Sequence, residues 1–157
     1  EALGDLIAAQ VSFKAKIVRG DERESPERTD AGSRKILNFG HALAHALEKV
    51  TGYRYLKHGE AVGYGMLYAA DLSKKLELLH SDEVESLNDV VHRSGTLPSI
   101  AHIDPLNVFE AFSYDKKVVD RSLQWVLLQG IGKPVIVPQK DIPRSVLAGS
   151  FKDLLKH

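Results

Sequence analysis

The 157-residue sequence contains no cysteine, which excludes a disulfide framework and any metal site built from thiolates. A metal ion would therefore need histidine, carboxylate or water ligands. Lysine plus arginine and aspartate plus glutamate are balanced at 21 each, so the basic excess of a nucleic-acid-binding surface is missing. Long apolar runs are also missing, since none reaches the ~18 residues of a membrane-spanning helix. We therefore expect neither nucleic acid nor membrane as a partner.

The sequence also lacks an initiator methionine, and its first residues, EALGDLIAAQ, lack the basic and then apolar layout of a signal peptide. The chain begins in what reads as the middle of a helix, so we expect a fragment of a longer polypeptide. Its composition, 43% hydrophobic and 27% charged, is typical of a globular domain with one core.

Apolar residues at helical spacing, separated by capping residues and glycine, predict a mainly helical domain. Ser81, Asp104 and Asp141 are expected to cap helices, and Gly52 to end one. The segment SLQWVLLQGIGKPVIV is rich in valine and isoleucine and predicts two short strands or one hairpin. The charged segment 20–33 predicts an exposed loop. The predicted helices cover residues 1–19, 33–50, 59–79, 81–95, 105–113 and 141–157.

Three histidines, His41, His45 and His58, lie in the segment RKILNFGHALAHALEKVTGYRYLKHGEAVGYGM. His41 and His45 are four residues apart, so they share one helical face and could reach one metal ion. The sequence HALAH lacks the glutamate of the HExxH motif, which excludes that metalloprotease chemistry. The alternative is a pair of tightly packed helices that contains histidines without a ligand.

The same predicted helix carries one polar stripe, whose residues are Arg34, Asn38, His41 and His45. Residues of these types indicate recognition of an anion or a metal, whereas a solvated helix face is the alternative. Gly63 and Gly65 lie in the interior of the next predicted helix, where glycine is unfavourable by ~1 kcal/mol relative to alanine. They indicate either a close approach of two backbones or space for a ligand.

The blocks RKILNFGHALAHALE and HGEAVGYGM resemble the signature of the 3-dehydroquinate synthase family, RxxLNxGHTxGHAxE followed by HGEAVxxGM. KAKIVRGDERE, YDKKV and LLQGIGKPVIV resemble further blocks of that family, so the likeness covers nearly the whole chain. Two features depart from the pattern. Ala42 and Ala44 replace the usual threonine and glycine, and the loop before Arg34 is longer. We expect the methyl group of Ala44 to lie near the site.

The resemblance implies the C-terminal, mainly helical domain of that fold, with a small β-hairpin and without the N-terminal Rossmann-like domain that holds most of the NAD site. It makes His41 and His58 ligands of a Zn²⁺ or Co²⁺ ion, with a third ligand, a glutamate, upstream of Glu1. It makes His45 a catalytic residue that contacts substrate and takes part in proton transfer. The further substrate-binding residues it implies are Lys14, Arg34, Asn38 and Lys116, with Lys117 as the alternative phosphate contact.

The implied reaction converts 3-deoxy-D-arabino-heptulosonate 7-phosphate to 3-dehydroquinate and phosphate in the shikimate pathway of aromatic amino-acid biosynthesis, with NAD regenerated in each turnover. The resemblance also implies a cytoplasmic homodimer. Alone, the chain is expected to be inactive and to bind metal weakly at most.

Other interpretations are a different sugar-phosphate cyclase, such as a 2-deoxy-scyllo-inosose synthase, or a non-catalytic helical module. Arg34 favours a substrate that carries a carboxylate. A relative of the iron-containing alcohol dehydrogenases is disfavoured by the blocks DERE, LNFGHxxxHALE and HGEAV.

Overall fold

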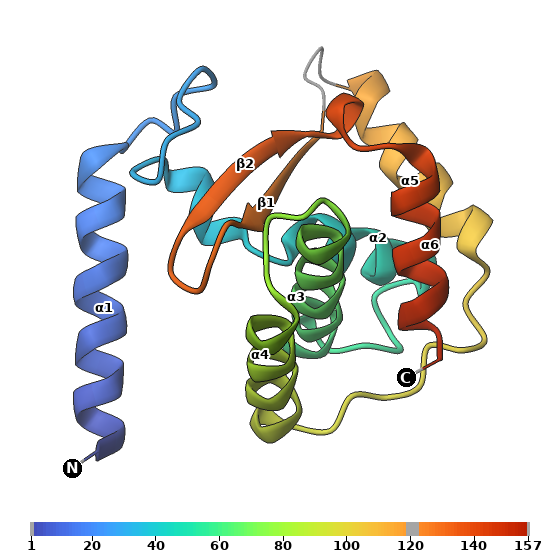
Figure 1. The fold of residues 1–157 in the computed structure, drawn as a ribbon, viewed down its shortest axis with the longest axis horizontal. Coiled ribbons are helices and arrows are strands. Elements are labelled where there is room, and N and C mark those ends of the chain that lie inside the picture. The colour runs from blue at the N-terminus through green and yellow to red at the C-terminus, as the bar shows by residue number, and fades with distance from the viewer. Residues whose placement is uncertain (1, 119–122, 157) are drawn as a thin grey trace.

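The computed structural model describes residues 2–118 and 123–156, with side chains for all of these except 113–118. It shows a mainly helical fold with one antiparallel hairpin, which confirms the predicted fold class (Figure 1). No helix within the described ranges is long and apolar enough to cross a membrane. The elements in chain order are α1 (Ala2–Gly20), η1 (Arg34–Asn38), α2 (His41–Val50), α3 (His58–Lys75), α4 (Ser81–Ser94), α5 (Pro105–Val118), β1 (Gln124–Leu128), β2 (Pro134–Pro138), η2 (Gln139–Asp141) and α6 (Arg144–Leu154).

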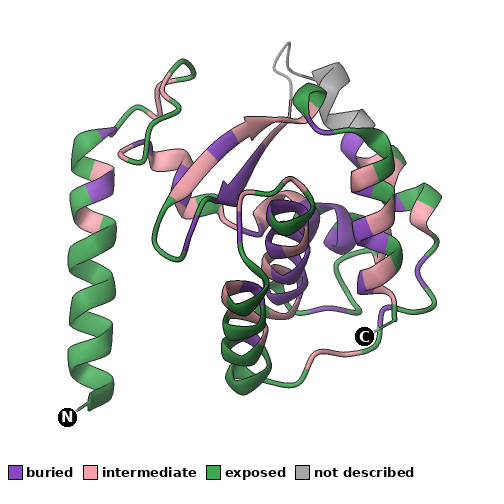
Figure 2. Ribbon diagram, in the orientation of Figure 1, coloured by how far each residue is buried: buried purple, intermediate pink, exposed green. Residues whose placement is uncertain are grey.

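Helix α3 is the central element of the fold. It packs against α2, α4, α6 and β1, and most of its surface is buried (Figure 2). The aromatic ring of Tyr68 lies 5.5 Å from Trp125 and 6.3 Å from Phe151, measured between ring centroids. The Tyr68 hydroxyl donates a 2.9 Å hydrogen bond to the carbonyl of Leu147, which joins α3 to α6. The core is therefore organised around α3.

The hairpin pairs Gln124 with Pro138 and Leu128 with Pro134, so β1 and β2 are in full register. Its two faces are covered by different parts of the chain. Trp125 and Leu127 belong to the main core, whereas Val126 packs in a separate cluster with Ile17 of α1 and Ile36 of η1.

The predicted helix 33–50 is wrong as a continuous element. Ser33 starts a helical segment as expected, but this is the 3-10 helix η1, and α2 begins only at His41. Between them Gly40 adopts a left-handed conformation with φ of 83°, and an added Cβ would lie 2.9 Å from the backbone nitrogen of Met66 in α3. The backbones approach too closely there for a side chain, and the left-handed residue breaks the helix.

Other boundaries differ by smaller amounts. Helix α3 ends at Lys75 rather than 79, because Glu77 takes a positive φ of 58° and the turn closes with Leu78 N donating to Ser73 O at 2.8 Å. Helix α4 keeps its predicted extent, with His80 rather than Ser81 at the N-cap position. Helix α6 begins after Pro143 rather than at Asp141, because a residue that precedes proline is driven into extended backbone.

Helix α1 stands beside the rest of the fold and touches it mainly through its C-terminal end (Figure 1). Ile17 is its one buried residue within the described chain. Its large apolar side chains that remain more than half exposed are Leu3, Leu6, Ile7, Val11 and Phe13.

Candidate functional site

The three histidines converge at the N-terminal ends of α2 and α3. The His41 ring centroid lies 5.4 Å from that of His58 and 5.7 Å from that of His45, and His45 and His58 are 6.3 Å apart. His41 is the first residue of α2, His45 lies one turn further on, and His58 is the first residue of α3. The site therefore joins residues of two helices.

The connection between the helices brings His58 back beside α2. Helix α2 ends where Gly52 takes a positive φ of 62°, and Tyr53 N donates to Glu48 O at 2.8 Å, so Gly52 stops the helix as predicted. Lys57 then caps α3, and its backbone N–H donates to the Glu60 carboxylate at 2.7 Å.

Close contact between backbones fixes the other side of the site. A Cβ at Gly65 would overlap the carbonyl oxygen of Gly40, so α3 lies directly against the turn that precedes His41. The helical glycines were expected either to allow a close approach of two backbones or to leave space for a ligand. Gly65 allows the close approach. Gly63 packs against Leu97, to which an added Cβ would come within 3.1 Å.

Glu48 is a residue of this site to which the sequence analysis assigned no role, although it is the last residue of the block RKILNFGHALAHALE. It is buried, and its two carboxylate oxygens contact two different rings: Oε1 lies 2.9 Å from Nδ1 of His58, and Oε2 lies 3.2 Å from Nδ1 of His45. A signal was available, because Glu48 lies three residues after His45 on the same helix. The contact with His58, ten residues away, had no local signal.

The hydrogen bonds recorded for these three rings all use Nδ1, since Nδ1 of His41 lies 3.3 Å from the carbonyl oxygen of Phe39. The Nε2 atoms are left for a ligand. Burial lowers the pKa of His41, and the Phe39 carbonyl offsets this only in part, so the neutral ring is favoured. Burial raises the pKa of Glu48, but hydrogen bonds from His58 and His45 outweigh it and leave that pKa below its usual value.

These rings fit a shared metal ion. At a Zn–N distance of about 2.0–2.1 Å, two imidazoles on one tetrahedral ion have ring centroids ~5 Å apart. The His41–His58 separation of 5.4 Å is the nearest to this value. Among the described residues, no group of three or more histidine, aspartate or glutamate side chains is placed so that together they could hold a metal ion.

An open pocket of about 520 Å³ lies beside His58, which forms part of its wall together with Glu48. Arg54 and Lys57 add positive charge to the same wall, Glu60 adds negative charge, and Tyr53 and Tyr55 add aromatic surface. The pocket is large enough for a small-molecule ligand.

The polar stripe predicted for residues 34–45 does not exist, because the helix breaks at Gly40. Arg34 lies on η1 and Asn38 is exposed at its end. The Arg34 side chain donates to the carbonyl of Glu22 at 3.1 Å and pairs with Glu24 at 3.9 Å. Neither residue has a recorded contact with the histidines in the part of the chain that is described.

Lys14 is exposed on α1. The side chains of Lys116 and Lys117 lie outside those that the structure describes. Ala44 is fully buried in the main core, and the expected nearness of its methyl group to the site stays a prediction. It faces the core because it lies on the same side of α2 as Leu47.

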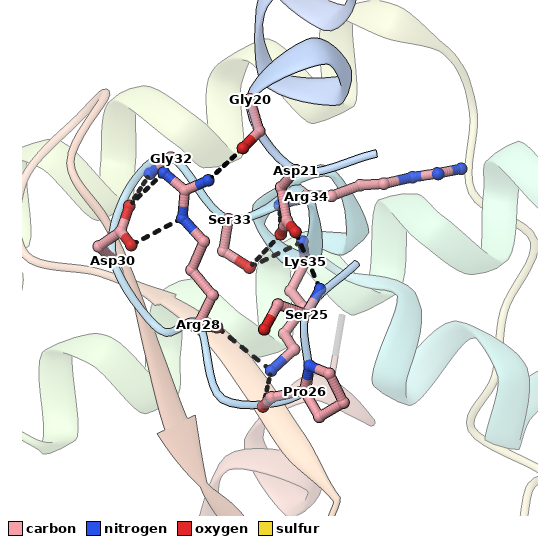
Figure 3. A network of polar contacts seen from close by, with 10 residues as sticks. All are labelled: Gly20, Asp21, Ser25, Pro26, Arg28, Asp30, Gly32, Ser33, Arg34 and Lys35. Atoms are coloured by element: carbon pink, nitrogen blue, oxygen red, sulfur yellow. Dashed lines mark hydrogen bonds and ion pairs between the residues drawn. The ribbon is translucent and has the colours of Figure 1, made fainter. Parts of the chain in front are cut away.

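The loop before Arg34 is ordered around the buried carboxylate of Asp21. This carboxylate accepts hydrogen bonds from the backbone N–H of Ser25 at 2.8 Å and of Arg34 at 2.9 Å, and from the Ser33 hydroxyl at 3.3 Å (Figure 3). The two backbone donors hold the pKa of Asp21 below its usual value. Arg28 pairs with Asp30 in the same loop. The first residue of the DERE block therefore fixes the start of η1.

Comparison with known proteins agrees with the sequence resemblance. A profile of the family described as "3-dehydroquinate synthase C-terminal" matches residues 1–118. A 3-dehydroquinate synthase of Acidithiobacillus ferrooxidans is 36% identical over 158 residues, which cover 100% of this chain and 41% of the relative. One from Acinetobacter baylyi is 38% identical over 141 residues, covering 89% of this chain and 37% of the relative. The chain spans about two fifths of the length of these relatives.

Two solved structures share the fold. A 2-epi-5-epi-valiolone synthase from Streptomyces hygroscopicus, with NAD⁺ and Zn²⁺ bound, is 22% identical and superposes over 99% of this chain and 40% of its own, with a TM-score of 0.73. A 2-deoxy-scyllo-inosose synthase, in complex with carbaglucose-6-phosphate, NAD⁺ and Co²⁺, is 25% identical over 76% of this chain and 34% of its own, with a TM-score of 0.64.

Proposed function

Because the chain belongs to the 3-dehydroquinate synthase family, we propose that it is the metal- and substrate-binding domain of an enzyme that converts 3-deoxy-D-arabino-heptulosonate 7-phosphate to 3-dehydroquinate and phosphate. The observation that supports this most is the convergence of His41, His45 and His58 from two helices, with His58 and Glu48 also lining an open pocket. The reaction belongs to the shikimate pathway, and we place the enzyme in the cytoplasm.

His41 and His58 would hold a divalent ion, either Zn²⁺ or Co²⁺, through Nε2, because Nδ1 of each ring already has a protein partner. Both metals suit histidine and carboxylate ligands. The third ligand would be a glutamate of a preceding region that also carries a Rossmann-like NAD site. When bound, the ion supplies Lewis-acid polarisation of a substrate hydroxyl and NAD⁺ supplies its reversible oxidation.

The other residues would position the substrate and move its protons. The His45 side chain is 61% exposed, so its Nε2 can reach a ligand in solution, and imidazole carries protons well near neutral pH. Arg34 would bind the substrate carboxylate through its planar pair of donors, which requires it to leave Glu24. Asn38, Lys14 and Lys116 would complete the contacts. The compact ammonium group of a lysine suits the substrate phosphate.

The active species would contain the preceding nucleotide-binding region and would assemble as a homodimer. By itself, the 157-residue chain would have no activity and would bind Zn²⁺ weakly at most, because two imidazoles without the carboxylate make an incomplete site. Calorimetric titration of the chain with Zn²⁺ checks this. Tight binding through three ligands that all come from this chain would refute it.

The decisive experiment measures phosphate release from the heptulosonate phosphate by the full-length polypeptide that contains this chain, with and without NAD⁺ and Zn²⁺. We expect release to require both and to fall more than ~100-fold in His58→Ala, since a ligand is lost. The matched control is His92→Ala, an exposed histidine of α4, which should retain activity.

A second candidate is a sister cyclase, supported by the 25% identity to the 2-deoxy-scyllo-inosose synthase. An enzyme that binds NAD⁺ and Zn²⁺ but releases phosphate only from a sugar phosphate without a carboxylate, such as glucose 6-phosphate, would support this candidate over the first. In that case Arg34→Ala should leave turnover nearly unchanged, because no carboxylate needs it.

A further inference from the structure

We propose that Glu48 is a positioning residue that holds the rings of His45 and His58 in one tautomer and orientation, with both Nε2 atoms available for chemistry. The roles of the two histidines rest on the proposed function, but the tautomer assignment does not. One carboxylate would then couple the metal-binding histidine to the proton-transfer histidine.

The geometry of Glu48 supports this coupling. The residue is 8% exposed and lies on α2 beside the fully buried Leu47. A carboxylate in such a place is costly unless its oxygens are hydrogen-bonded. Here each oxygen contacts a different imidazole, one on the same helix and one at the first residue of α3. The carboxylate is therefore satisfied only when both rings face it.

The chemistry of the contact determines the tautomer. An ionised carboxylate only accepts hydrogen bonds, so His45 and His58 must each present a protonated Nδ1 to it. In the neutral ring the lone pair then lies on Nε2, which is the atom that can bind a metal ion or take a proton. Histidines that bind metals commonly donate their other N–H to a carboxylate in this way.

His41 provides an internal comparison. Its Nδ1 contacts the carbonyl oxygen of Phe39 instead of a carboxylate, so its tautomer is set independently of Glu48. A substitution at Glu48 should therefore change the tautomers of His45 and His58 and leave that of His41 unchanged.

The first test is ¹⁵N NMR of the histidine-labelled 157-residue chain at one pH at which the rings are neutral. We expect the Nδ1–H tautomer at all three rings. In Glu48→Ala, His45 and His58 should shift toward the Nε2–H tautomer that free imidazole favours in water, while His41 keeps its own. Glu85→Ala, at an exposed glutamate of α4, should change none.

Glu48→Gln is a second variant for the case in which Glu48→Ala does not fold, because glutamine has nearly the same size as glutamate. Its side-chain amide has one accepting oxygen and one donating nitrogen, so it can satisfy one Nδ1–H but not both. We expect one of the two rings to change tautomer in this variant while the backbone amide spectrum stays dispersed. Unchanged tautomers at His45 and His58 in a folded variant would overturn the proposal.

The second test uses the full-length holoenzyme. Glu48→Ala, which removes both accepting oxygens, should weaken Zn²⁺ binding by about 10–100-fold, measured by competition with a chelator. It should also lower kcat at saturating Zn²⁺, because excess metal does not reorient His45. In a His45→Ala background the same change should still weaken Zn²⁺ binding but should no longer lower kcat. A Zn²⁺ affinity within twofold of the parent, or a kcat loss that persists in that background, would overturn the proposal.

The two proposals fail in different ways. If the tautomers change as expected but the parent enzyme releases no phosphate from the heptulosonate phosphate, the proposed function is wrong and the positioning role stands. If the parent enzyme is active but the tautomers of His45 and His58 do not change when Glu48 is substituted, the function stands and the positioning role is wrong.

Discussion

Helices α1 and α3 are nearly equal in length, at 19 and 18 residues, yet α3 is mostly buried and α1 mostly exposed (Figure 2). Helix α3 is covered on several sides, whereas α1 leaves Leu6 57% and Val11 62% exposed. Both sequences contain enough apolar residues to form a buried face. An apolar pattern therefore predicts a helix, but whether that helix is buried depends on which other elements pack against it.

The comparison also separates two parts of the proposed site. His58 begins α3 and contacts the buried Glu48, whereas Lys14 is exposed on α1 with no such recorded partner among the described residues. Contacts within the described chain therefore bring the three histidines together. No contact among the described residues brings Lys14 to them.

The largest expected effect comes from adding a methyl group to each helix. Gly65→Ala in α3 should destabilise the protein by about 3 kcal/mol or more, because the new Cβ would overlap the Gly40 carbonyl, which belongs to rigid backbone. Gly4→Ala in α1 meets no atom within 4 Å and should instead stabilise the protein by up to ~1 kcal/mol. Urea denaturation of both variants checks the contrast, which a tolerated Gly65→Ala would contradict.

Removing an apolar side chain from each helix tests the same contrast from the opposite direction. Leu72 of α3 is fully buried, so Leu72→Ala should cost about 2–4 kcal/mol through lost burial and a cavity. Leu6→Ala in α1 should change stability by no more than ~0.5 kcal/mol. If both variants lose stability equally in denaturant titrations, α1 is covered in solution and the contrast fails.

A smaller effect is expected where α3 meets α6. Tyr68→Phe removes the hydroxyl that donates to Leu147 O in the core, leaving a buried carbonyl without this donor, and should cost ~1 kcal/mol. Tyr53→Phe, at an exposed tyrosine outside the core, is the control and should cost almost nothing. Thermal unfolding of both variants gives the measurement, and equal melting temperatures would show that the buried hydrogen bond adds no stability.

The smallest effect depends on pH. Hydrogen bonds from Lys156 and Lys75 lower the pKa of Asp153 to about 2. A carboxyl group whose pKa is depressed in the folded state stabilises that state above its unfolded pKa and loses this contribution as pH falls. Asp153→Asn should therefore lower stability at pH 7, and the gap to the parent should close between about pH 4 and pH 2. Chemical denaturation across this range gives the readout, and a gap independent of pH would contradict it.

Much of the fold was predictable because the signals were local. Helix spacing, Gly52 at the end of α2, Asp104 before α5 and the hairpin all follow from short stretches of sequence. The boundary error at Lys75 arose from a turn whose conformation the residue types did not reveal, whereas the error at Asp141 overlooked Pro143, a signal present in the sequence.

The candidate site was predictable in part. The family motif placed His41, His45 and His58 in one site, and the structure brings these rings together, although their individual roles remain predictions. Spacing alone would have paired His41 with His45, whereas His41 and His58 lie closest. Glu48 belongs to the quoted motif but was assigned no role, because its contact with His58 crosses from one helix to another.

The sequence by itself determined the helical class, the hairpin, the lack of thiolate chemistry and the motif that carries the histidines. Residue periodicity, capping and side-chain chemistry are properties of short segments, so they can be read without coordinates. Only the tertiary structure decided the break at Gly40, the exposure of α1 and the carboxylate shared by His45 and His58. Each of these depends on which backbone or side chain approaches from another element, and sequence spacing does not specify that approach.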